Sequence, residues 1–126
     1  MNELNIEPTQ STPSVAGRWE EGVLSLGGDS FPENSYEFFG GVIDWIERYL
    51  AGSDRPLRLD LRLMYMNTSS VKAMMDIFDM LEDAYRSGRA VAVRWYHDPH
   101  NERVADLAAE FREDCTFPFD IEQDHV

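Results

Sequence analysis

Cysteine and long apolar runs are nearly absent from this sequence. Cys115 is the only cysteine, so no disulfide can form within the chain, which suits a reducing compartment. No stretch approaches the roughly 18 apolar residues that a membrane helix requires. Segment 1–10 also lacks the basic start and apolar stretch of a secretory signal. We therefore expect a cytoplasmic protein without membrane insertion.

Positive charge is scarce as well. The sequence holds 11 Lys and Arg residues against 24 Asp and Glu residues, which gives a net charge of −13. Such a surface repels the phosphate backbone of nucleic acids and the head groups of anionic membranes, so we expect no nucleic-acid partner. The length of 126 residues is that of one domain. We expect segment 1–14 to be a loose or lightly paired N-terminal arm and segment 15–126 to form the single domain.

Motifs that support catalysis or cofactor binding are also missing. The pairs of adjacent glycines in the sequence do not match the pattern of a glycine-rich phosphate-binding loop. His97 and His100 lack a convincing third metal ligand. Asp76, Asp79 and Asp83 share one side of a predicted helix, a pattern more typical of a solvated face than of an acid–base pair. We predict no catalytic residues, no metal and no cofactor, and a small enzyme built on these side chains is the alternative.

Hydrophobic periodicity divides the chain into strands and helices. From Leu57 to Leu63 every second residue is leucine and the intervening residues are polar, which predicts a strand with one buried and one wet face. Asp98 is placed to cap a helix that has Pro99 in its first position. The full pattern predicts a hairpin over 15–29, helices over 35–51, 69–86 and 99–113, and strands over 57–66, 90–96 and 117–121. We expect an α/β fold with a mixed sheet of about four to five strands and three helices mainly on one face.

The junction from Met66 to Ser70 joins a buried strand to a long helix. Functional sites of open α/β sheets collect at such strand ends, where backbone N–H groups lack partners. A phosphate on Thr68 would meet free donors and the positive end of the helix dipole, and would add about −1.5 to −2 charges. The same residues also form an ordinary helix cap, so the pattern alone leaves both interpretations open.

The helix that follows carries more apolar residues than one buried stripe requires. Its predicted core face contains Val71, Met74, Met75, Phe78, Leu81 and Tyr85. A second stripe, Ala73, Ile77, Met80 and Ala84, indicates either a partner-docking surface or a more deeply buried helix. We predict phosphorylation at Thr68 and a partner-binding surface made of Asn67, Ser69, Ser70, Lys72, Ala73, Asp76, Ile77 and Met80.

A leucine-rich strand that ends in MNTSS (66–70) at the head of a helix resembles STAS-type anti-sigma-factor antagonists. In those proteins a hydroxyl residue at this turn is phosphorylated, and Thr68 takes its place here. Segment 71–73 lacks the small residues that commonly follow that turn. A closer resemblance, to the SiaC family of bacterial regulatory phosphoproteins, rests on the segments FPENSY (31–36), NTSSVKAMMDIFD (67–79) and FRED (111–114).

The SiaC resemblance implies a STAS-like fold and a non-enzymatic switch in biofilm and aggregation control. It implies that a SiaB-like protein kinase phosphorylates Thr68 and that a SiaA-like PP2C-type phosphatase removes the phosphate. The unphosphorylated form would bind and activate a SiaD-like diguanylate cyclase, which raises cyclic di-GMP. The alternative, from the broader resemblance, is an anti-sigma-factor antagonist in a partner-switching sigma pathway.

Overall fold

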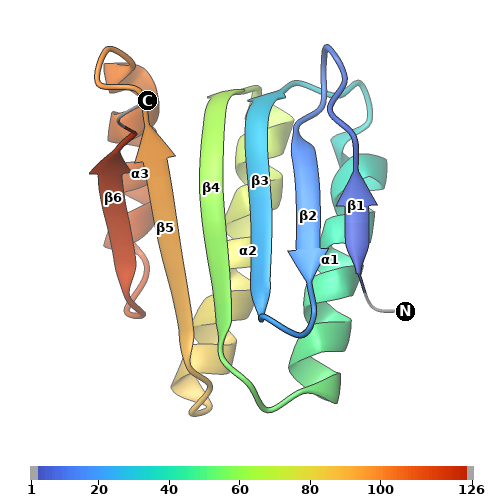
Figure 1. Ribbon diagram of the computed structural model, residues 1–126. Helices are drawn as coiled ribbons and strands as arrows, with labels where there is room; N and C mark the ends of the chain where they lie inside the picture. The colour runs from blue at the N-terminus through green and yellow to red at the C-terminus, as the bar shows by residue number, and fades with distance from the viewer. Residues whose placement is uncertain (1–2, 125–126) are drawn as a thin grey trace.

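The computed structural model describes residues 3–124 and shows a single mixed sheet backed by helices (Figure 1). The sheet has six strands in the order of the chain, with β1 and β2 antiparallel to their successors and β3 to β6 parallel to one another. The elements are β1 (Leu4–Ile6), β2 (Ser14–Arg18), β3 (Val23–Ser30), α1 (Ser35–Gly52), β4 (Leu57–Met66), α2 (Thr68–Arg86), β5 (Val91–His97), α3 (Glu102–Glu113) and β6 (Phe119–Gln123).

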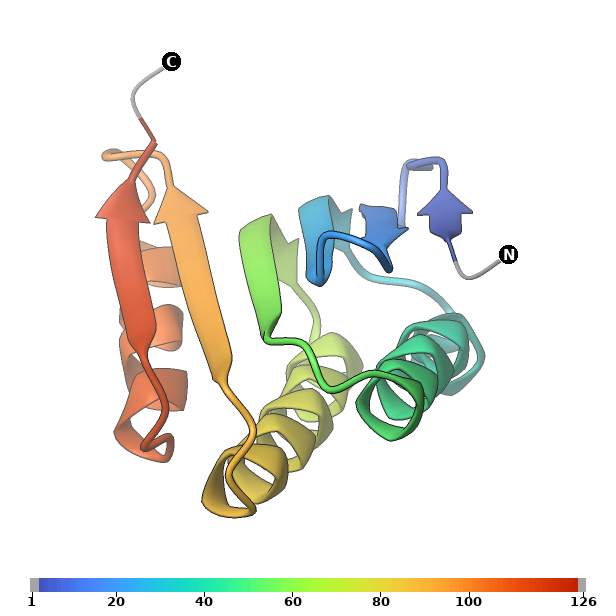
Figure 2. The ribbon, with the colours of Figure 1, turned by 60° about the horizontal axis from the view of Figure 1, so that its bottom comes forward.

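All three helices lie on one face of the sheet because of the connectivity. Each helix joins two neighbouring parallel strands by a right-handed crossover, and every new strand is added on the same side (Figures 1 and 2). The predicted α/β fold is therefore confirmed. The sheet has one strand more than the largest number expected, since β1, within the predicted arm, pairs Leu4 with Gly17 and Ile6 with Val15.

The core fills the space between the sheet and the helices. Alternate residues of β4 are buried against the helices, as the leucine pattern predicts, and the residues between them face the open side of the sheet. Trp45 of α1 covers Gly17, where a Cβ atom would stand 2.8 Å from the indole ring. Among residues 3–124, no helix is both long and apolar enough to cross a membrane.

The last helix begins later than its sequence indicates. Its N-cap is Asn101, whose side chain accepts a hydrogen bond from the Val104 N–H at 3.2 Å. The prediction that Asp98 caps a helix starting at Pro99 is wrong. Asp98 instead stabilises its own turn, accepting from the backbone N–H groups of His100 (2.8 Å) and Asn101 (2.9 Å).

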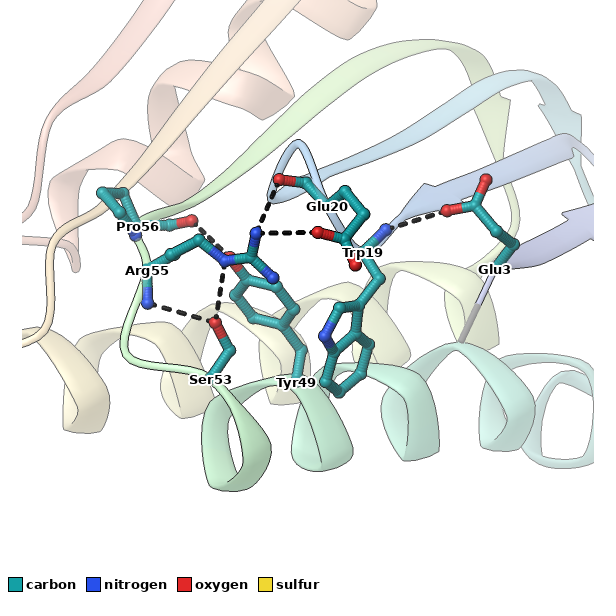
Figure 3. A network of polar contacts seen from close by, with 7 residues as sticks. All are labelled: Glu3, Trp19, Glu20, Tyr49, Ser53, Arg55 and Pro56. Carbon is teal, nitrogen blue, oxygen red and sulfur yellow. Dashed lines mark hydrogen bonds and ion pairs between the residues drawn. The ribbon is translucent and has the colours of Figure 1, made fainter. Parts of the chain in front are cut away.

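The end of the sheet at which β4 begins, which we call the amino end, is held by polar contacts (Figure 3). The Tyr49 hydroxyl donates to the Pro56 carbonyl at 2.8 Å. Arg55 donates to the backbone carbonyl of Glu20 at 3.0 Å and to its carboxylate at 3.1 Å. The Tyr49 contact holds the α1–β4 connection against α1, and Arg55 bonds this connection to the turn between β2 and β3.

Candidate functional site

At the opposite end of the parallel strands, the carboxyl end, β4 passes directly into α2. Asn67 is the N-cap of α2, and its side chain accepts the Ser70 N–H at 2.9 Å. The first turn of α2 contains no acidic side chain, so nothing in it neutralises the positive end of the helix dipole. The sequence thus places Thr68 as the first residue of a 19-residue helix.

The three hydroxyl residues of this turn lie in different environments. Thr68 is exposed, and its side chain forms no hydrogen bond within the described part of the chain. Ser69 is exposed but its hydroxyl lies 2.6 Å from that of Ser35. Ser70 is fully buried, 2.8 Å from the Ser30 hydroxyl, and donates to the Ser30 carbonyl at 3.1 Å. Of the three, Thr68 is the one whose hydroxyl is both accessible and unengaged.

The serine contacts also fix how the two helix starts sit beside each other. Ser30 ends β3, and its carbonyl accepts the Asn67 N–H at 2.9 Å. Ser35 opens α1 and Ser69 lies in the first turn of α2. The β3–α1 connection is therefore bonded to the β4–α2 junction at three points, and the N-termini of both helices are held side by side.

A groove of about 610 Å³ runs between the N-terminal halves of α1 and α2, next to Thr68. Its apolar lining includes the buried Phe39 and the half-buried Ile43 and Ala73, while Tyr36, 92% exposed, lies at its α1 border. The lining residues are Ser35, Tyr36, Phe39, Gly40, Ile43, Asp44, Glu47, Ser69, Lys72, Ala73 and Asp76. An apolar groove with a charged border suits an amphipathic protein segment better than a small polar ligand.

Four of the predicted partner-binding residues line this groove: Ser69, Lys72, Ala73 and Asp76. Asn67 lies at the helix cap and Met80 is half-buried further along α2. Ile77 is fully buried and, like Ser70, cannot touch a partner in this conformation. The two predicted stripes of α2 were divided wrongly, because Met75 is 50% exposed whereas Ile77 packs into the core with Met74 and Phe78.

The sequence prediction missed a group of exposed apolar side chains at the carboxyl end. Phe31 follows β3 and Tyr65 lies near the end of β4, and their rings meet edge to face with centroids 6.0 Å apart. Met64, which precedes Tyr65 in β4, and Tyr36, in the first turn of α1, are exposed as well. The available signal was the break in alternation at the end of β4, where Leu63 is followed by three more apolar residues.

The candidate metal ligands His97 and His100 lie at a different cavity from the groove beside Thr68. His97 and His100 line a second cavity, of about 700 Å³, in which Arg62 is already paired with Asp124 at 3.0 Å. Within residues 3–124, no group of three or more His, Cys, Asp or Glu side chains could hold a metal ion. Burial raises the pKa of the Cys115 thiol to about 11, which disfavours the nucleophilic thiolate.

Comparison with known proteins identifies the family. Residues 6–124 match the SiaC family of regulatory phosphoproteins. The chain belongs to the SiaC family. It is therefore a regulatory phosphoprotein rather than an enzyme.

Similar proteins come from Pseudomonas aeruginosa. An uncharacterized protein of strain UCBPP-PA14 is 64% identical over 122 residues, which is 97% of each chain. The structure of SiaC from this organism is 61% identical and superposes with a TM-score of 0.93 over 98% of the present chain and all of that chain. A second structure shows the diguanylate cyclase SiaD in complex with its activator SiaC, with 64% identity, a TM-score of 0.94 and coverage of 96% and 99% of the two chains.

Proposed function

We propose that this SiaC-family protein is a cytoplasmic switch whose unphosphorylated form binds and activates a diguanylate cyclase, and that Thr68 is the phosphorylated residue. The activity would raise cyclic di-GMP and thereby control biofilm formation and aggregation. One observation carries the assignment: Thr68 is an exposed, unengaged hydroxyl at the start of α2, beside an apolar groove. The similar SiaC protein that was crystallised with SiaD supports the choice of partner.

The position of Thr68 explains how a phosphate would act. The unpaired N–H groups and dipole of the first turn of α2 favour a negative group, by about 0.3–1 kcal/mol from the dipole alone. A partner that covers the groove would have to desolvate this new charge of about −1.5 to −2 next to an apolar surface. Phosphorylation would therefore be tolerated by the fold and would oppose docking.

The enzymes that set the switch are part of the proposal. A SiaB-like protein kinase would add the phosphate to Thr68, and a SiaA-like PP2C-type phosphatase would remove it. Both need access to the hydroxyl, which the exposure of Thr68 provides. Ser70 is too deeply buried for either enzyme to reach without opening the turn.

The test compares two variants of Thr68 with a control variant at the other end of α2. Thr68→Ala should accept no phosphate but bind the cyclase as the unmodified protein does, whereas Thr68→Glu should bind at least tenfold more weakly. Ser87→Ala, at the exposed C-terminal cap of α2, should change neither property. Phosphate incorporation is measured by intact mass and site mapping, and affinity by titration calorimetry.

Two outcomes would contradict the proposal. Full phosphate incorporation into Thr68→Ala would move the modification to another residue. Failure of the unmodified protein to bind any diguanylate cyclase, with recovery of a sigma-pathway protein instead, would favour the anti-sigma-factor antagonist.

A further inference from the structure

The groove beside Thr68 contains an unusual cation. Lys72 is the only lysine in the sequence, and the other ten basic residues are arginines. Its side chain is exposed and forms no ion pair or hydrogen bond within residues 3–124. Arg48, on the neighbouring helix, is in contrast paired with Asp44 at 3.0 Å. Lys72 is thus an unpartnered positive charge on a strongly acidic protein.

Lys72 stands one helical turn after Thr68, at the spacing that brings side chains together. Residues four apart on a helix have Cβ atoms about 5–6 Å from each other, and an acidic group before a lysine is the favourable order. Both residues are exposed, and the cap by Asn67 and the buried Ser30–Ser70 contact hold the turn between them in place. Lys72 also lines the groove.

We propose that Lys72 reports the state of Thr68 to the partner. In the unmodified protein its ammonium group is free to pair with a carboxylate of the docked cyclase. In the phosphorylated protein the phosphate on Thr68 pairs with Lys72 and withdraws it from the partner. This inference rests on the proposed function and adds a regulatory residue to it.

In the competition for Lys72, the phosphate on Thr68 is favoured over a carboxylate of the partner. The phosphate carries up to two charges and three strong acceptor oxygens, and its pairing with Lys72 is local to one turn. The other acidic residue at this spacing, Asp76, carries one charge and forms no ion pair with Lys72 in the unmodified protein. Phosphorylation would therefore remove a positive contact as well as add a negative charge.

A first experiment tests the intramolecular pair without any partner. In ³¹P NMR titrations of protein phosphorylated by the kinase, the second pKa of phosphothreonine, near 6 in the absence of neighbours, should be lower in the native protein than in Lys72→Gln. Lys72→Arg should keep the lower value, because the charge is retained. The helix dipole acts equally on all three proteins and cancels. Equal titration curves for the native protein and Lys72→Gln would overturn the proposed pairing.

A second experiment tests the contact with the cyclase. Lys72→Gln in the unphosphorylated protein should weaken binding about tenfold, as loss of one charge-assisted contact does, and Lys72→Arg should restore most of the affinity. Arg48→Gln, which removes an already paired cation from α1, is the control and should leave affinity unchanged. In the Thr68→Glu background, Lys72→Gln should lower the affinity for the cyclase by less, because the carboxylate introduced at position 68 already neutralises Lys72.

The outcomes separate this inference from the proposed function. If the native protein binds the cyclase and Lys72→Gln binds equally well, the role of Lys72 is contradicted while the switch stands. If the native protein does not bind a cyclase, or the phosphate maps away from Thr68, the proposed function itself fails.

Discussion

The two ends of the sheet are built in opposite ways. At the amino end, charged side chains bond to backbone carbonyls: Arg89 donates to Leu50 at 3.1 Å and to Arg55 at 3.0 Å, and also to Ser53, which satisfies the C-terminal end of α1. At the carboxyl end, the inner polar contacts are hydrogen bonds between pairs of serine hydroxyls. The apolar side chains that remain exposed there are Phe31, Tyr36, Met64 and Tyr65.

The two ends therefore have different roles, the amino end in stability and the carboxyl end in recognition. The amino end uses Tyr49, Arg55 and Arg89 to satisfy backbone carbonyls within the protein. The carboxyl end leaves the Thr68 hydroxyl and several apolar side chains exposed, and the groove between α1 and α2 opens there. Exposed apolar side chains in contact with each other, as Phe31 and Tyr65 are, are typical of an interaction surface. We therefore expect substitutions at the amino end to affect folding and those at the carboxyl end to affect binding.

The largest effect on stability is expected for Gly22→Ala at the amino end. Gly22 has φ of 68°, and an added Cβ would stand 2.3 Å from the Pro56 carbonyl oxygen and 2.6 Å from the Tyr49 hydroxyl. The left-handed conformation and the collision with backbone together should lower the free energy of unfolding by about 3 kcal/mol. Urea denaturation measures this loss, and cyclase affinity per folded molecule should not change. A loss below about 1 kcal/mol would show that this turn relaxes freely.

A pH-dependent effect is expected at Glu82, in the C-terminal half of α2. The Thr116 hydroxyl and N–H, at 2.6 and 2.7 Å, and Arg86 lower the pKa of this carboxyl to about 2. Since the folded state favours the charged form, the stabilisation is present at neutral pH and is lost as pH falls from about 4.5 toward 2. Glu82→Gln should be less stable at neutral pH and should flatten the curve of unfolding free energy against pH in that range.

Glu110→Gln is the control for this titration, because Glu110 is an exposed glutamate of α3. It should leave the shape of the curve unchanged. If Glu82→Gln and Glu110→Gln give the same pH dependence, the contacts to Thr116 do not stabilise the folded state.

The smallest effect is expected for two glycines within α1, which form a matched pair. A Cβ atom on Gly40 or Gly41 would meet nothing within 4 Å, so Gly→Ala at either position should stabilise the protein by about 0.5–1 kcal/mol. Gly40 lines the groove and Gly41 does not. If the partner approaches the helix closely, Gly40→Ala should weaken cyclase binding whereas Gly41→Ala should not. Equal affinities would place the partner away from this part of α1.

Much of the fold could be predicted because its signals are local. The leucine alternation in β4 marks which face is buried, and Asn67 ahead of a long apolar helix marks where α2 begins. The exposure of Ser69 and the burial of Ser70 could not be predicted. They depend on Ser35 and Ser30, which lie 34 and 40 residues away in the sequence and come close only when α1 and β3 are in place.

The sequence by itself determined the strand–helix alternation, the acidic surface and the hydroxyl-rich turn at Thr68, because periodicity, charge and helix capping act between near neighbours. The tertiary structure decided that Ile77 belongs to the core, that Asn101 caps α3, and that Thr68 and Lys72 lie beside a groove shared with α1. These outcomes depend on how the helices are rotated against the sheet and against each other, which no short stretch of sequence specifies.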